Sequence, residues 1–142
     1  MSIDVLELGR AIKQLQYLNH RCLETGLREI DTTLAQWDAL RAIDNHPGAS
    51  AHVLAEATFQ TDQSFGTLAT RMIAKGFVAR QQGVGRALVH CLTEKGRSVL
   101  EQGFIVAQCV IDASFRNLSE GERDQLLRLA RKALLDYGQE KL

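Results

Sequence analysis

Two short helical patterns follow one another between residues 50 and 75, and their order restricts the fold more than any other feature of the sequence. Ser50 and Thr61 are each suited to cap a helix, because a hydroxyl at that position accepts a hydrogen bond from the first turn. The predicted apolar face of the first helix is Val53, Leu54 and Ala57. The second helix repeats apolar residues at helical spacing, which predicts an inward stripe of Phe65, Leu68, Ala69, Met72 and Ile73.

The segment after these helices has the composition of a β-hairpin. Lys75 and Gly76 are suited to end the second helix, since glycine accepts a left-handed cap and a cation is favourable at that end. Residues 77–82 and 87–92 are β-prone runs, and the glycines of the Gly83 to Arg86 loop can supply the positive φ angles of a tight turn. Helix, turn, helix and hairpin is the order of a winged helix-turn-helix, a device that reads duplex DNA.

The outward face of the second helix carries side chains suited to DNA. Small hydroxyls, an amide, an arginine and Gly66 allow close approach and offer hydrogen bonds to phosphates and base edges. We assign this face to the major groove and place Arg86 at the hairpin tip, within reach of a minor groove. The predicted DNA contacts are Ser50, Thr61, Gln63, Ser64, Thr67, Thr70, Arg71, Lys75, Arg80 and Arg86.

The charge of the chain is unevenly distributed. The 17 basic and 17 acidic side chains cancel, which on its own argues against a nucleic-acid partner. However, residues 61–90 carry four basic residues and one acid, a net charge of +3, whereas residues 31–60 carry one basic residue and four acids. A patch this modest predicts weak binding by one copy, with useful affinity when two copies grip neighbouring half-sites.

The two ends of the chain are predicted to hold those copies together. Residues 4–27 form a long helical pattern with more apolar surface than a small lobe can cover. Thr93 is suited to cap a helix after the hairpin, and Ser119 with Glu122 forms the capping box of a last helix. A twofold dimer would bury these stripes and would require a pseudo-palindromic DNA site. The predicted interface residues are Val5, Leu8, Ile12, Leu15, Leu126, Ala130, Leu134 and Tyr137.

The remaining segment completes the predicted organisation. Thr33 and Gln36 make another capping box, followed by an inward face of Trp37, Leu40 and Ile43. The expected fold is mainly α with one small hairpin. A single chain of 142 residues comprises a DNA-binding lobe over 33–92 and a helical dimerisation region over 1–30 and 93–142.

Several function classes are excluded or disfavoured by composition. No apolar run approaches the roughly 20 residues needed to cross a bilayer, and the N-terminus lacks the pattern of a secretion signal, so we expect a cytoplasmic protein. Three widely spaced cysteines suggest neither a disulfide framework nor a metal pair. The four histidines are scattered, with His46 and His52 interpreted as turn and surface residues. We therefore predict no enzyme activity, no metal and no cofactor.

Five landmarks, in order and at the right spacing over essentially the whole chain, resemble the MarR family of bacterial transcriptional regulators. They include T-x-x-Q-W-x-x-L at Thr33 to Leu40, K-G-F-V-x-R at Lys75 to Arg80 and R-A-x-V-x-x-L-T-E-K-G at Arg86 to Gly96. The resemblance implies a triangular helical homodimer with winged lobes, usually a repressor. It places the reading helix at Thr61 to Lys75 and the wing arginine at Arg86.

Two positions depart from what the resemblance leads us to expect. Members commonly carry Asp-x-Arg in the wing, but here the three positions are Val84, Gly85 and Arg86, so the acid that helps hold the hairpin is missing. Gly66 lies inside the reading helix, where glycine costs about 1 kcal/mol relative to alanine. Close approach to DNA and simple tolerance on an exposed face both account for it.

The resemblance also implies regulation by a small anionic aromatic compound or by cysteine oxidation. The implied effector pocket lies where the first helix, the second helix and the helix after the wing meet, although Trp37 is better explained as core and Arg41 as a partner of nearby acids. Its candidate residues are Tyr17, His20, Arg21, Trp37, Arg41 and Phe104.

Two alternatives to the ligand-responsive regulator remain. A redox-sensing regulator would use Cys22 in the first helix, although that cysteine stands only eleven positions before Thr33, later than in peroxide sensors, and Cys91 and Cys109 are better explained as structural. A winged-helix module that binds protein and no longer binds DNA would expose apolar or acidic groups on the reading helix. The polar, basic face observed there favours DNA.

Overall fold

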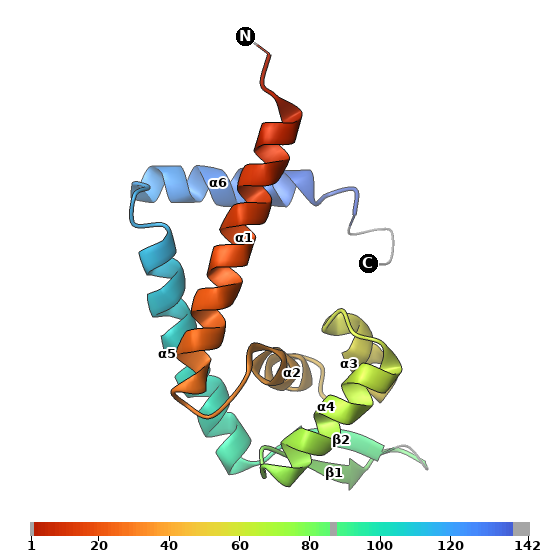
Figure 1. Ribbon diagram of the computed structural model, residues 1–142. Coiled ribbons are helices and arrows are strands. Elements are labelled where there is room, and N and C mark those ends of the chain that lie inside the picture. The colour runs from red at the N-terminus through yellow and green to blue at the C-terminus, as the bar shows by residue number, and fades with distance from the viewer. Residues whose placement is uncertain (1, 86–87, 138–142) are drawn as a thin grey trace.

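The computed structural model describes residues 2–85 and 88–137, which form six helices and one antiparallel hairpin that lies at one edge of the molecule (Figure 1). The confirmed fold class is mainly α with a small β wing. None of the helices in these residues is long and apolar enough to cross a membrane. In chain order the elements are α1 (Val5–Arg28), α2 (Leu34–Asn45), α3 (Ala51–Ala57), α4 (Asp62–Ala74), β1 (Val78–Gln82), β2 (Leu88–Leu92), α5 (Glu94–Ser114) and α6 (Glu120–Ala133).

The predicted caps begin the helices as expected. The Ser50 hydroxyl accepts from the Val53 N–H at 3.2 Å, and the Thr61 hydroxyl accepts from the Ser64 N–H at 3.1 Å. Thr93 caps α5 in the same way. The capping boxes that start α2 and α6 are both complete. These side chains satisfy backbone donors that a helix cannot pair internally, so they fix where each helix starts.

The hydrophobic core lies where α2, α3 and α4 meet the strands and the first half of α5. The predicted stripe of α4 is confirmed, with Phe65, Leu68, Ala69 and Met72 buried and Ile73 packed beside them. One prediction is wrong: α3 buries Leu54 and Ala55, whereas Val53 and Ala57 face solvent. The helix has only 7 residues, so one adjacent pair is enough to seat it on α4.

The hairpin pairs Val78 with Leu92 at its base and Gln82 with Leu88 at its outer end. Gly76 ends α4 with a φ of +78°, as predicted, and Gly85 has a φ of +73° in the loop, where a side chain on the backbone would be strained. The prediction for Arg86 at the tip lies outside the described residues, as does Ala87.

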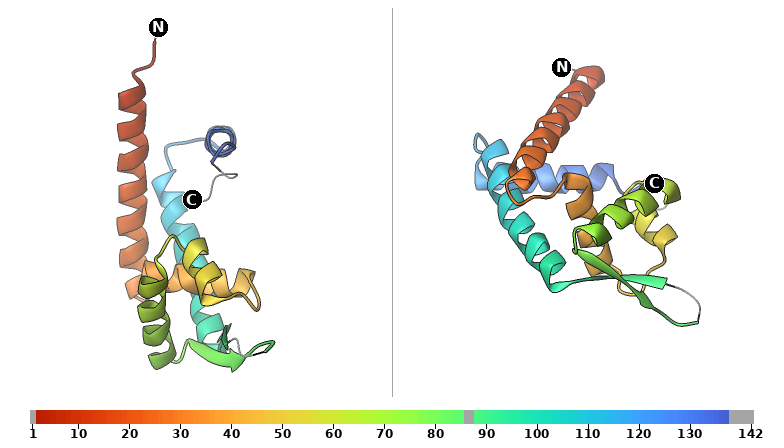
Figure 2. Two further views of the ribbon diagram at one scale, coloured as in Figure 1. Left: turned by 90° about the vertical axis from the view of Figure 1, so that its right-hand side faces the viewer. Right: turned by 60° about the horizontal axis from the view of Figure 1, so that its bottom comes forward.

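The long helices form a frame that extends away from this lobe. The last turns of α1 pack on α5, where Gly26 faces Val106. In contrast, residues 2–14, which comprise the segment before α1 and its first half, are all exposed. Figure 2 shows that α6 crosses the far end of α5 and stands apart from α1. No residue of α6 is buried. The predicted stripe extends too far, because α6 ends at Ala133 and Tyr137 lies in a turn beyond it.

Candidate nucleic-acid interface

The outward face of α4 is exposed and polar, as the sequence predicts. Gln63, Thr67, Thr70 and Arg71 face solvent, and Gly66 is half-buried among them. Beside this face a hollow of about 410 Å³ separates α4 from the start of α2. The hollow is lined by Ala35, Gln60, Gln63, Ser64, Thr67, Leu68 and Arg71. The structure thus brings four of the predicted contacts to the edge of one concave surface.

The hydroxyls and the longer side chains on this face differ in what they can donate. The Thr67 hydroxyl donates to the Gln63 carbonyl at 3.1 Å, and the Thr70 hydroxyl donates to the Gly66 carbonyl at 3.0 Å. Each threonine therefore offers an acceptor and a methyl group outward. Within residues 2–85 and 88–137, no hydrogen bond uses the side chains of Gln63, Ser64 or Arg71 as donors, so the donors of these three side chains are left for solvent or a partner.

Lys75 does not point outward with the rest of the predicted contacts. Its ammonium donates to the Asp31 carbonyl at 2.6 Å and to Gln36 Oε1 at 3.3 Å, and its side chain is only 32% exposed. The C-terminal end of α4 is therefore tied to the loop between α1 and α2. Among the predicted basic contacts whose positions are described, Arg71 and Arg80 are exposed.

His52 links the two helices of the helix-turn-helix, a contact that the sequence interpretation missed. Its Nδ1 lies 2.8 Å from Asp62 at the start of α4, and its Nε2 lies 3.2 Å from Glu56. The hydrogen bond to Asp62, followed by the charges of Asp62 and Glu56, raises the pKa of His52 above its usual range. An imidazolium there offsets two carboxylates beside the reading helix. The i, i+4 spacing of His52 and Glu56 was the available signal.

His90 connects the wing to the reading helix from the inner side. Its ring meets the ring of Phe65 edge to face at 5.9 Å, and within the described residues neither ring nitrogen has a hydrogen-bond partner. Burial, with a smaller effect from the charge of Arg80 on the paired strand, lowers the pKa of His90. The neutral imidazole is therefore the form that fits between wing and helix.

Replacing His90 with phenylalanine is expected to remove part of the acid sensitivity of the lobe. Because the folded-state pKa of His90 is depressed, the unfolded chain takes up its proton first, and stability is lost as the pH falls below about 6.5. The variant should match the parent in urea unfolding near pH 7.5 and exceed it near pH 5.5. His52 acts in the opposite sense in both proteins, so their difference isolates His90. An equal loss of stability in both would contradict this assignment.

Gly66→Ala is expected to stabilise the protein by up to about 1 kcal/mol, because a methyl group there meets open space and alanine favours the helix. The matched control is Gly103→Ala. Gly103 is buried against the Trp37 indole, and a methyl group would overlap the ring, so this change should destabilise by about 1–3 kcal/mol. Chemical denaturation of the three proteins measures both. A loss of stability in Gly66→Ala would show that the helix does not tolerate even this small addition.

The predicted effector residues fall into two groups. Trp37 is buried, as expected of core, and its Nε1 donates to the Leu100 carbonyl at 3.1 Å. The Arg41 guanidinium lies 4.8 Å from the Trp37 ring and 5.8 Å from the Phe104 ring, and it pairs with Asp38 at 3.5 Å.

The second group lies on α1 and faces different space. The Arg21 guanidinium lies 5.8 Å from the exposed Tyr17 ring, and His20 is also exposed. Arg41 borders a cavity of about 210 Å³, and Arg21 borders a separate groove beside α1. Both sets come from the predicted helices, but the protomer does not gather them around one cavity.

The three cysteines differ in their exposure to solvent. Cys22 and Cys109 are exposed, and both line a groove of about 540 Å³ between α1 and α5. Cys91 is half-buried in β2, where its thiol donates to Gln81 Oε1 at 3.5 Å.

Comparison with known proteins agrees with this architecture. Residues 30–87 match the model of the MarR family. The chain is 27% identical over 129 residues to the transcriptional regulator HosA of Escherichia coli O127:H6, covering 89% of this chain and 96% of that protein.

Two solved structures share the fold. A mutant of E. coli MarR complexed with operator DNA is 24% identical with a TM-score of 0.81, covering 92% of this chain and 96% of that one. The Mycobacterium tuberculosis MarR family protein Rv2887, in complex with p-aminosalicylic acid, is 24% identical with a TM-score of 0.76, covering 89% and 97%. With its helix-turn-helix, paired wing and flanking helices, this chain has the fold of the MarR proteins, and its residues 30–87 match the MarR family model.

Proposed function

We propose that two copies of this chain bind a pseudo-palindromic operator and repress the adjacent genes. The observation that carries the proposal is the outward face of α4, where Gln63, Ser64 and Arg71 hold hydrogen-bond donors that the fold itself does not use. A neighbour with the same fold is complexed with operator DNA. The lobe over residues 33–92 would grip the DNA, with α4 in the major groove.

The wing and the helix ends would add contacts to the DNA backbone. Arg80 is exposed on β1, and the proposal keeps Arg86 as a minor-groove contact on the strength of its sequence position alone. Ser50 and Thr61 stand at the N-terminal ends of α3 and α4, where helix dipoles favour phosphates. Lys75 is left out of this set because its ammonium is already held by the fold.

The homodimer would form through residues 1–30 and 93–142. Val5, Leu8 and Ile12 of α1 are 75%, 53% and 52% exposed, and Leu134 and Tyr137 are 58% and 57% exposed. Apolar surface on this scale marks an interaction face. Leu15 and Leu126 are half-buried and Ala130 is exposed, so each predicted interface residue retains accessible surface.

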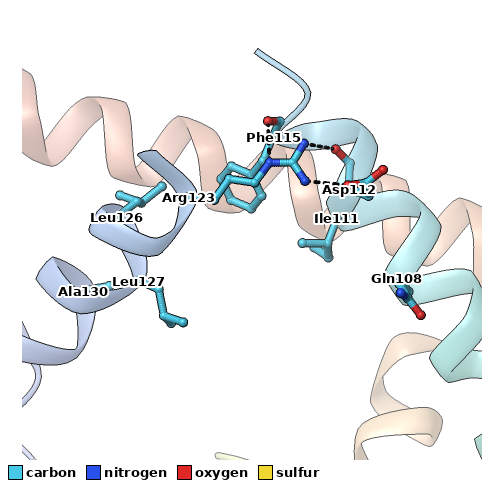
Figure 3. A pocket seen from close by; sticks show the side chains of 8 residues that line it. All are labelled: Gln108, Ile111, Asp112, Phe115, Arg123, Leu126, Leu127 and Ala130. Atoms are coloured by element: carbon cyan, nitrogen blue, oxygen red, sulfur yellow. Dashed lines mark hydrogen bonds and ion pairs between the residues drawn. The ribbon is translucent and has the colours of Figure 1, made fainter. Parts of the chain in front are cut away.

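The angle between α5 and α6 supplies a matching concave surface, drawn in Figure 3. Ile111 and Phe115 of α5 face Leu126, Leu127 and Ala130 of α6 across a groove of about 470 Å³. Arg123 closes its end by bonding Asp112 and the Phe115 carbonyl. The exposed apolar half of α1 from a second copy would fill this groove, and twofold symmetry would repeat the contact.

An anionic aromatic compound is the proposed effector. Arg41 already lies over the Trp37 and Phe104 rings, and a ligand carboxylate would compete with Asp38 for its guanidinium. The cavity beside Arg41 is smaller than the roughly 300 Å³ of common ligand sites, so binding would require the neighbouring helices to move. Such movement would change the spacing of the two reading helices.

Genome-wide selection of DNA fragments by the purified protein tests the main proposal. We expect a small set of inverted repeats bound as a dimer, and release on addition of salicylate or a related phenolic acid. Quenching of Trp37, the one tryptophan in the chain, would report ligand at the proposed site. Equal binding to all fragments, or binding to none, would reject the operator proposal. Release of DNA without any change in Trp37 emission would show that the effector binds at another site.

Redox sensing is retained as a second candidate, because Cys22 is exposed and shares a groove with Cys109. Treatment with peroxide followed by operator titration, carried out on the parent and on Cys22→Ser, distinguishes redox sensing from ligand sensing. Loss of binding in the parent alone would favour the redox function.

A further inference from the structure

The C-terminal end of the reading helix is fastened to the loop between α1 and α2 through one side chain. Lys75 caps α4, and its ammonium donates to the Asp31 carbonyl at 2.6 Å and to Gln36 Oε1 at 3.3 Å, with the Asp31 carboxylate 3.7 Å away. Bonds from a charged donor are shorter and stronger than neutral ones. The partners lie in the loop and in the first turn of α2, more than 35 residues earlier in the chain, so this is a tertiary link and not a local cap.

The acceptor side of this link is rigid. Gln36 is 6% exposed, and the same amide oxygen also accepts from the Thr32 hydroxyl at 3.2 Å and from the Thr33 N–H at 3.4 Å. Asp31 has a φ of +56°, a left-handed backbone conformation that is uncommon outside glycine but that aspartate adopts more readily than most residues. One buried oxygen therefore gathers the end of the loop, the start of α2 and the end of α4.

The Lys75 ammonium also lies over an aromatic ring. Lys75 Nζ lies 5.3 Å from the centre of the Phe77 ring, and Phe77 is 1% exposed. The Lys75 carbonyl accepts from Lys95 Nζ at 3.0 Å. The two bonds at its ammonium and the neighbouring ring restrain the side chain, and the bond at its carbonyl restrains the backbone.

We propose that Lys75 is a positioning residue, which sets the angle between the reading helix and α1 and does not itself contact phosphate. This inference rests on the proposed function. Because α1 would meet the second copy and α4 would enter the groove, a link between them sets the distance and tilt between two reading helices. Operator affinity depends on that geometry, since both half-sites must be engaged together.

The test compares Lys75→Met with Gln36→Met in operator titrations over a range of salt concentrations. Methionine at 75 keeps a long unbranched side chain but removes the ammonium, whereas methionine at 36 removes the acceptor and preserves every charge. We expect both variants to bind the operator about tenfold more weakly, and the double variant to be no weaker than the worse single one, because both break the same link. The salt slope of Gln36→Met should equal that of the parent.

A phosphate contact would give a different pattern. Lys75→Met would then lower the slope of log affinity against log salt by about 0.9 for each copy, and Gln36→Met would leave binding unchanged. That result, or unchanged affinity in both variants, would overturn the inference. Lys95→Met is the matched control, because its ammonium also lies near the Phe77 ring, at 5.4 Å, but does not reach the loop. It should weaken binding less than Lys75→Met.

Two further measurements separate positioning from folding and from failure of the function itself. Stoichiometric titration gives the fraction of each protein preparation that can bind the operator. If Lys75 only stabilised the fold, the variant would have a lower binding fraction, but the affinity corrected for that fraction would equal that of the parent. Hydrogen exchange of the free protein should become faster at residues 29–33 in Lys75→Met, an effect that loss of a phosphate contact would not produce. If the parent binds no operator, the proposed function fails; if the parent binds and the variants match it, only the role of Lys75 fails.

Discussion

Leu127→Asp is expected to separate the protein into monomers and to abolish operator binding at concentrations where the parent binds fully. Leu127 is 47% exposed in its own protomer and lines the groove between α5 and α6, so a carboxylate there is tolerated by the protomer. Burying that unpaired charge in a twofold interface costs several kcal/mol and occurs twice. The dimer dissociation constant should therefore rise by at least about a thousandfold.

Sedimentation velocity measures this change, with Gln125→Asp as the control. Gln125 lies on the opposite side of α6 and is exposed, so an added carboxylate there should leave the dimer intact. Circular dichroism of the lobe should be the same in both variants, since α6 buries nothing in the protomer. A Leu127→Asp protein that remained dimeric would place the interface somewhere other than this groove.

Arg71→Ala is expected to weaken operator binding by roughly 30-fold to 20,000-fold without changing the dimer. The side chain is exposed in the last turn of the reading helix, beside the hollow that Gln63 and Thr67 also line. One arginine contact to a base or phosphate contributes about 1–3 kcal/mol, and a symmetric operator engages two copies, so the loss is doubled.

Gel-shift titration against the selected operator provides the measurement, and Arg128→Ala is the matched control. Arg128 pairs with Asp124 on the outer face of α6 at 3.2 Å. Its replacement by alanine therefore removes one positive charge, as Arg71→Ala does, but at a position away from the proposed DNA contact. If Arg71→Ala and Arg128→Ala bound the operator equally well, Arg71 would not be a DNA contact. A loss confined to one base pair of the operator would identify the base that it reads.

Local chemistry explains why much of the lobe could be predicted from the sequence. Ser50, Thr61 and Thr93 each satisfy N–H groups within three residues, so a single chain segment contains the whole interaction. The α4 stripe follows from helical spacing in the same way. Val53 was placed wrongly because a helix of two turns offers too few apolar residues for its spacing to select one face.

The site was less predictable, because its decisive contacts join distant segments. Lys75 was counted as a DNA contact from its charge and position, but its partners Asp31 and Gln36 are separated from it by the whole helix-turn-helix. The contact of His90 with Phe65 likewise requires the hairpin to fold back on α4. Cys22 and Cys109 share a groove only because α1 lies along α5.

The absence of buried residues in α6 makes the integrity of that helix a function of protein concentration. A helix of 14 residues is marginal in water when little packs on it, and within the described part of the protomer none of its apolar side chains is fully buried. As the protein is diluted below the dissociation constant of the dimer, α6 and the exposed start of α1 should fray and become open to proteases while the lobe stays folded. Newly made or surplus monomers would then be degraded by proteases that attack their exposed terminal helices, and the cell would retain the protein mainly as the dimer.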